Sequence, residues 1–320
     1  MKKLSLLITT LFLSLVIFAG CSAGSTAAKN TKVDQINISY VKLPLNVPSI
    51  IERKKNLFET EFAKDNTKIV YSDITAGPKM TEAMAAGSLD FANALGGASA
   101  ILAASNGVDL KIIGIYSRAP KSFTIMAKDA SIKTAADLKG KKVVGPKGTI
   151  LHQLLLAAAE KANLKATDVN FINMDINTGV SAMLAGSADA ALVAGPAVAQ
   201  AEKNGAHVVT TGEGLLDATI VIAVRGDFLK NHPDLVKRYM SVHQSSLDFM
   251  KNNLDETYKL TAEETQLTVE QVKDMYSLYD FSPAVTAKDI TELEKTQDFL
   301  IKNNMMTKKV DIKSLIATVN

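Results

Sequence analysis

The chain has 320 residues, of which 47% are hydrophobic and 22% are charged, a composition typical of a globular protein rather than a disordered one. This length can bury one large core or two modest ones. The net charge is +3, and it falls to +1 without Lys2 and Lys3. No basic cluster with interleaved aromatic residues occurs in the sequence, so a nucleic-acid binder is not indicated.

Residues 1–20 have the features of a signal peptide. Lys2 and Lys3 precede an apolar run, Leu4–Phe18, that is too short and too one-sided for a lasting membrane span. The sequence Phe18-Ala19-Gly20-Cys21 resembles the bacterial lipobox, although Leu is commoner than Phe at its first position. The resemblance implies lipidation of Cys21 and a membrane anchor outside the cytoplasm. The alternative is ordinary secretory cleavage beside a chance cysteine.

Cys21 is the only cysteine, which excludes internal disulfides and cysteine catalysis. Residues 21–32 are mostly small and polar and are predicted to form a flexible tether. The elements that follow alternate between strand and helix, which favours a parallel sheet with crossover helices. They comprise a strand over Gln35–Lys42, a helix over Ser49–Phe62 and strands over Lys68–Ser72 and Leu110–Tyr116.

The segment Gly77–Ala100 is largely repeated at Gly179–Ala201. The aligned residues are Met84, Gly87, Ser88 and Asp90 in the first copy and Met183, Gly186, Ser187 and Asp189 in the second. Each copy predicts a helix, a turn, a short buried strand, a glycine turn and a second helix. Two copies of one α/β unit predict two similar lobes. The two aspartates are interpreted as structural, because they begin strands at the end away from the expected cleft.

The chain is expected to cross between the lobes at Ser117–Lys121 and to return along Ala218–Arg225. This places residues 33–118 and 221–320 in lobe 1 and residues 119–220 in lobe 2. Further strands are expected at Ser122–Ala127, Lys142–Gly145, Val169–Met174 and His207–Thr210. The predicted helices 233–254, 269–279 and 287–303 carry charged residues among apolar ones at helical spacing, so they are assigned to packing against lobe 1.

The lipobox, the repeat and the two crossings together resemble the solute-binding lipoproteins of ABC importers. The most similar branch is the nitrate, sulfonate and taurine type, which includes binders of thiamine-pyrimidine precursors. The resemblance covers residues 33–310 and is carried by AGPKMTEAMAAGSLDFANALGGASAILAAS (76–105), DLKGKKVVGPKGTILHQLLLAA (137–158), AGSADAALVAGPAVAQAEKNG (185–205) and VRGDFLKNHPDLVKRYM (224–240). An aromatic residue common after the second-lobe strand of taurine-type relatives is replaced by Ala194-Gly195, so no named substrate is carried over.

The resemblance implies a two-lobed α/β fold of the periplasmic-binding-protein type (type II). Each lobe would be a mostly parallel sheet flanked by helices, with extra C-terminal helices on lobe 1. It also implies a monomer without a cofactor. This monomer would capture a small anionic or zwitterionic organic solute, similar to sulfonates, taurine or nitrate, between its two lobes and deliver it to an ABC permease and its ATPase.

In such sheets the ligand lies beyond the carboxyl ends of the strands, against helix N-termini whose free N–H groups favour anions. The expected ligand-binding residues are Lys42, Asn46, Thr75, Gly77, Gly96, Gly97, Ser99, Arg118, Thr149, His152, Asn177, Gly195 and Asp217. Arg118 could pair with an anion, His152 could contact the ligand, and Asp217 could receive an amine. For each of these three, a structural or solvent-exposed role stays open.

Two other classes of function remain as alternatives. The first is an enzyme on the same fold that acts on a thiamine-pyrimidine-type metabolite, although no metal cluster, nucleophile elbow, P-loop or paired carboxylates occur in the sequence. The second is a sensor that signals through a separate membrane partner.

Overall fold

The computed structural model describes residues 32–319. The predicted signal peptide, the lipidation site Cys21 and nearly all of the predicted tether lie outside the described residues. Within residues 32–319 no helix combines the length and the apolar character that a membrane crossing requires.

The described chain forms two five-stranded sheets with matching strand orders. The first sheet has the order β2 (Lys68–Ser72), β1 (Gln35–Ser39), β3 (Phe91–Gly96), β10 (Thr219–Arg225) and β4 (Leu110–Arg118). The second has the order β7 (Asn170–Asn173), β6 (Lys142–Gly145), β8 (Ala190–Ala194), β5 (Phe123–Ala127) and β9 (His207–Thr211). In each sheet four strands share one direction and the fourth in order, β10 or β5, runs against its neighbours. The sequence repeat is therefore a repeat of structure.

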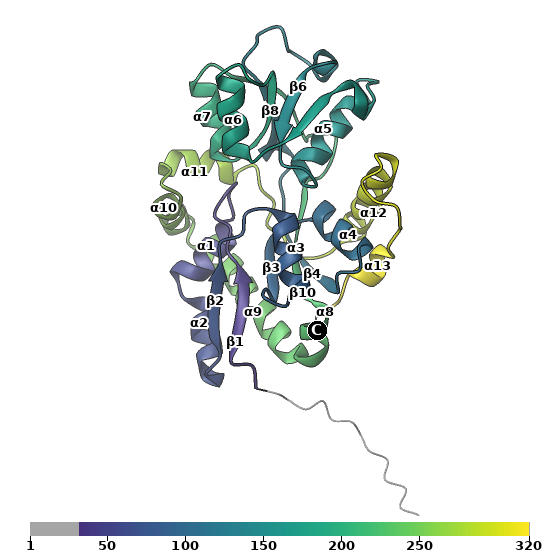
Figure 1. Cartoon of the computed structure of the whole chain (residues 1–320). Coiled ribbons are helices and arrows are strands. Elements are labelled where there is room, and N and C mark those ends of the chain that lie inside the picture. The colour runs from purple at the N-terminus through teal and green to yellow at the C-terminus, as the bar shows by residue number, and fades with distance from the viewer. Residues whose placement is uncertain (1–31, 320) are drawn as a thin grey trace, which may run out of the picture. The chain divides into compact units, whose positions relative to one another are not determined.

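Helices flank both sheets (Figure 1). Between residues 47 and 203 they are α1 (Val47–Lys54), α2 (Leu57–Phe62), α3 (Gly77–Ala85), α4 (Gly97–Ser105), α5 (Ile150–Lys161), α6 (Ile176–Leu184) and α7 (Pro196–Lys203). The C-terminal part contains α8 (Gly226–Asn231), α9 (Pro233–Asn252), α10 (Leu254–Thr265), α11 (Val269–Tyr276), α12 (Ala287–Lys302) and α13 (Ile312–Leu315). In Figure 1, α5, α6 and α7 lie around β6 and β8, and α3 and α4 lie beside β3 and β4.

Three predicted helices end differently from the expectation. The helix over 49–62 is broken into α1 and α2, because Asn56 adopts the left-handed conformation, with φ of 50°. The helix over 233–254 ends at Asn252 and is followed by α10, which the sequence analysis did not predict. The helix over 269–279 stops at Tyr276, so Tyr279 belongs to an irregular segment.

The repeated Gly-Ser-x-Asp residues close each helix and fasten the next strand. Gly87 and Gly186 follow α3 and α6 with φ of +73° and +76°, a conformation that favours glycine. The Asp90 carboxylate accepts the N–H of Asn37 at 2.8 Å, and the Asp189 carboxylate accepts the N–H of Lys142 at 2.7 Å. The structural interpretation of both aspartates is confirmed.

The chain passes between the sheets close to the two predicted crossings, Ser117–Lys121 and Ala218–Arg225. β4 ends at Arg118 in the first sheet and β5 begins at Phe123 in the second. The return lies between β9 and β10, so Thr219 and Ile220 already belong to the first sheet, two residues before the predicted boundary at 221. The division into two lobes stays a prediction.

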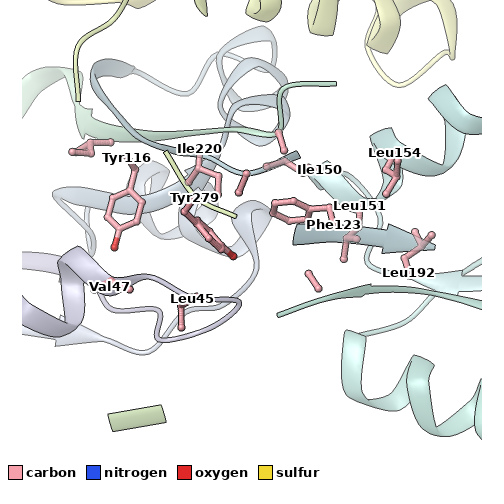
Figure 2. Packing of buried hydrophobic residues seen from close by; sticks show 14 of the residues in the cluster. Leu45, Val47, Tyr116, Phe123, Ile150, Leu151, Leu154, Leu192, Ile220 and Tyr279 are labelled. Carbon is pink, nitrogen blue, oxygen red and sulfur yellow. The ribbon is translucent and has the colours of Figure 1, made fainter. Parts of the chain in front are cut away.

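One apolar cluster includes buried residues from both sheets, among them Phe91 and Ile220 of the first and Ile125 and Leu192 of the second. Figure 2 shows part of this cluster around Phe123, Tyr279 and Leu151. Beneath the first sheet lies a buried polar pair, in which the Nδ1 atom of His243 is 2.7 Å from the Glu52 carboxylate. Both side chains are essentially unexposed.

Candidate functional site

Turns that follow strands of different sheets lie in contact. The Ser99 hydroxyl of α4 donates to the Gly148 carbonyl of the loop before α5, at 2.9 Å. A β-carbon placed on Gly96 would lie 3.3 Å from the Ile150 side chain, and one on Gly195 would lie 2.6 Å from the Pro44 backbone. The predicted turns at Gly96, Ser99 and Gly195 thus meet turns of the opposite sheet.

Among the helices that begin at these turns, α4 and α5 have N-termini with neither a side-chain cap nor a proline. Neither Gly96 nor Thr149, their N-cap residues, caps the helix with its side chain, and neither helix has a proline in its first turn. The first-turn N–H groups of a helix have no intrahelical acceptor and carry partial positive charge. The Ser99–Gly148 hydrogen bond and the Gly96–Ile150 contact bring these two helix starts together.

The other helix N-termini near these turns have fewer N–H groups available for an anion. Helices α1, α3 and α7 have a proline in the first turn, which removes one N–H donor from each. Gly77 opens α3 with its Cα packed against the side chain of Ser99. The start of α6 is capped by the Asp175 carboxylate, which accepts the N–H of Thr178 at 3.0 Å. That carboxylate opposes an anion near Asn177, whose own side chain is exposed.

Four buried side-chain oxygens in this region have no hydrogen-bond partner. They are Asn46 Oδ1, Ser117 Oγ, Ser122 Oγ and the Tyr279 hydroxyl. All four residues are at least nine-tenths buried. Because a buried polar group without a partner costs stability, these four atoms are candidates for hydrogen bonds to a ligand. The sequence analysis selected only Asn46 of the four.

His152 lies in the first turn of α5 and is buried against Phe171, with ring centroids 4.3 Å apart. Burial, together with a smaller effect of the neighbouring Lys147 charge, lowers the pKa of His152 to about 4. The ring is therefore neutral at pH 7. The Gly148 N–H donates to its Nδ1 atom at 3.4 Å, so Nε2 carries the proton. His152 thus holds the loop whose carbonyl Ser99 contacts.

The three charged residues of the predicted set are paired within the chain. The ammonium of Lys42 lies 3.5 Å from the Glu264 carboxylate, and the carboxylate of Asp217 lies 2.8 Å from the ammonium of Lys288. The guanidinium of Arg118 donates to Asp280, Asp289 and two carbonyls. The recognition chemistry left at these turns is neutral: backbone N–H groups, hydroxyls and an amide.

The remaining predicted residues, Thr75, Gly97 and Thr149, lie in the same turns. The Thr149 hydroxyl donates to the Pro146 carbonyl within its own turn, and Thr75 is exposed beside Gly77. A β-carbon on Gly97 would lie 3.2 Å from the Thr219 carbonyl, which places the start of α4 against β10.

Neither of the two cavities described for the chain lies at these turns. One, of about 280 Å³, is lined by residues such as Thr134 and Leu215, and the other, of about 410 Å³, by residues such as Met84 and Arg225. Neither of these two cavities is therefore the expected gap between the sheets. Residues 32–319 also contain no group of three or more side chains suited to hold a metal ion.

A family model described as "NMT1/THI5 like" matches residues 62–257. A putative aliphatic sulfonates-binding protein of Bacillus subtilis (strain 168) is 29% identical over 319 residues, which cover 98% of this chain and 94% of the relative. The crystal structure of the periplasmic aliphatic sulphonate binding protein SsuA from Escherichia coli superposes with a TM-score of 0.77 at 25% identity, over 90% of this chain and 93% of that one. The predicted α/β fold of the periplasmic-binding-protein type is confirmed by this similarity.

The same fold also occurs in an enzyme. The structure of the desulfurization enzyme DSZB superposes with a TM-score of 0.65 at 15% identity, over 89% of this chain and 96% of that one. At that identity the likeness concerns the fold alone. Both binding proteins and enzymes therefore have this fold, so the function has to be inferred from the residues of the site.

Proposed function

Because this chain belongs to the NMT1/THI5-like family, we propose that it is an extracytoplasmic solute-binding protein that captures a small organic anion, best an aliphatic sulfonate, between its two lobes. The observation that carries the proposal is the meeting of the uncapped N-termini of α4 and α5, which follow strands of different sheets. An anion held by both helix starts favours the closed arrangement, since only that arrangement brings the two sets of N–H groups together.

A neutral site suits a sulfonate. Backbone N–H groups bind a weakly basic anion without the desolvation cost of a buried lysine or arginine. Apolar residues of the shared cluster, such as Leu45, Phe123 and Ile150, pack beside the turns and would receive an alkyl tail. The predicted amine acceptor, Asp217, is already paired with Lys288. We therefore expect an alkyl sulfonate to bind more tightly than an aminosulfonate such as taurine.

The rest of the proposal follows from the resemblance. Cys21 is proposed as the lipidated anchor, residues 22–32 as the tether, and an ABC permease with its ATPase as the recipient of the solute. The protein is proposed to act as a monomer and to leave its ligand chemically unchanged. The full-length similarity to the Bacillus sulfonates-binding protein supports this arrangement.

Isothermal titration calorimetry on the purified mature chain tests the proposal. We expect ethane- and hexanesulfonate to bind in a 1:1 ratio, with hexanesulfonate tighter because each buried CH₂ contributes about 0.8 kcal/mol. Hexanol and hexylamine serve as controls without the anion and should not bind. Binding of either control with no response to sulfonates contradicts the anion site. Mass spectrometry of the recovered ligand detects turnover, which would contradict a non-enzymatic role.

A further inference from the structure

Tyr279 brings a buried hydroxyl to the junction of the two sheets. Its side chain is 9% exposed and belongs to the same apolar cluster as Leu45, Phe123 and Ile150. In Figure 2 the Tyr279 ring lies near Phe123, with the loop of Leu45 and Val47 below it. Its hydroxyl has the Ser122 hydroxyl nearby but makes no well-formed hydrogen bond within the described chain. Since a buried tyrosine usually finds a partner for its hydroxyl, the missing partner requires an explanation.

Ser122 lies close to Tyr279 and is also unpaired. It follows the first crossing between the sheets, and its side-chain oxygen is buried without a hydrogen-bond partner. Burial raises the pKa of the Tyr279 hydroxyl well above its ordinary value, and the Ser122 hydroxyl, which lies within reach as a hydrogen-bond partner, opposes part of that rise. Tyr279 therefore stays protonated and remains a donor throughout the physiological pH range.

Arg118 fixes the segment that carries Tyr279. Its backbone exchanges two hydrogen bonds with Asp280, from Arg118 N to Asp280 O at 2.8 Å and from Asp280 N to Arg118 O at 2.9 Å. All five donors of its guanidinium are used: two bonds to the Asp289 carboxylate, one to the Asp280 carboxylate and one each to the carbonyls of Ser282 and Ala284. The predicted ligand contact of Arg118 thus has no donor left to make it.

This segment lies beside the start of α4. Arg118 pairs with Thr219 in the sheet, and the Thr219 carbonyl lies against Gly97 in the first turn of α4. Tyr279 is next to Asp280 in the chain, so these contacts connect its segment to the start of α4 through β4 and β10. Ser122 is four residues beyond Arg118 and is held on the other side of the crossing.

We propose that the hydroxyls of Tyr279 and Ser122 donate hydrogen bonds to the bound anion, and that Arg118 is a positioning residue that keeps Tyr279 in place. The inference rests on the proposed function and extends it to a chain segment outside both copies of the repeat. A sulfonate has three oxygens, so it can accept from these hydroxyls while the helix starts contact its other oxygens.

The test compares Tyr279→Phe with Tyr276→Phe by calorimetric titration with hexanesulfonate. Tyr279→Phe should weaken binding tenfold or more, because a hydrogen bond to a charged group is lost. Tyr276→Phe removes a neighbouring, half-buried hydroxyl and should bind like the wild type. Ser122→Ala removes the second proposed hydroxyl donor and should weaken binding severalfold. Circular dichroism confirms that each variant is folded.

Arg118→Lys should weaken binding in the wild-type background but add little to Tyr279→Phe. A purely structural role of Arg118 would instead weaken both backgrounds equally, which would overturn the positioning role. If the wild type binds hexanesulfonate and Tyr279→Phe binds as tightly as Tyr276→Phe, the inference fails while the proposed function stands. If the wild type binds no sulfonate, the proposed function itself fails.

Discussion

Gly195→Ala is expected to weaken sulfonate binding about 100-fold. Gly195 joins β8 to α7 with φ of 66° and ψ of −146°, and a β-carbon there would lie 2.6 Å from the Cα atom of Pro44 and 2.7 Å from its carbonyl oxygen. Overpacking of this kind costs about 1–3 kcal/mol, and each 1.4 kcal/mol is a factor of ten in affinity. The turns can separate to relieve the clash in the free protein, so the cost falls on the closed, ligand-bound state.

Gly186→Ala is the matched control. Gly186 also has a positive φ, +76°, so alanine is strained there too, but no atom lies within 4 Å of the added β-carbon. This variant should lose some stability and keep its affinity for hexanesulfonate. Equal affinities of the two variants in calorimetric titration would show that closure of the turns at Gly195 is not needed for binding.

Lowering the pH from 7 to 4 is expected to remove about 2–4 kcal/mol of stability through His152. Burial lowers the pKa of His152 from its ordinary 6.5 to about 4 in the folded chain. Between these values the unfolded chain binds more protons than the folded one, so stability rises with pH across this window. The contribution is present in full above pH 6.5 and is lost as the pH falls toward 4, at 1.36 kcal/mol per pKa unit.

His152→Asn should flatten this part of the pH dependence. The asparagine carbonyl can still accept the Gly148 N–H that Nδ1 accepts in the wild type, but it does not titrate. His207→Asn, at the start of β9, serves as the control for replacing a histidine elsewhere in the chain. Urea unfolding at half-unit steps from pH 4 to pH 7 measures the effect, and an unchanged slope in His152→Asn would contradict a buried neutral ring.

The fold could be predicted because its signals are local and repeated. Gly87, Ser88 and Asp90 recur one lobe later as Gly186, Ser187 and Asp189, and each set performs the same capping and strand-fastening role. Short apolar runs predicted the central strands. The break in the strand–helix alternation at 117–121 and the apolar run at 218–225 predicted the passages between the sheets. Such signals survive in a single sequence since they depend on neighbours along the chain.

The partners of the charged residues could not be predicted in the same way. Arg118 meets Asp280 and Asp289 more than 160 residues later, and Asp217 meets Lys288. The residues near Arg118 in the sequence do not show whether its guanidinium binds carboxylates of the same chain or a ligand. Tyr279 was missed for the opposite reason: its surroundings were assigned to a packing helix, whereas α11 ends at Tyr276.

The measurement that tests the central claim most directly is a crystal structure of residues 32–320 with hexanesulfonate. We predict sulfonate oxygens within hydrogen-bond distance of first-turn N–H groups of both α4 and α5, with the alkyl tail against the apolar cluster near Leu45 and Phe123. A sulfonate bound to only one of the two helix starts, or at a site away from both, would contradict the claim that the lobes close on a shared anion.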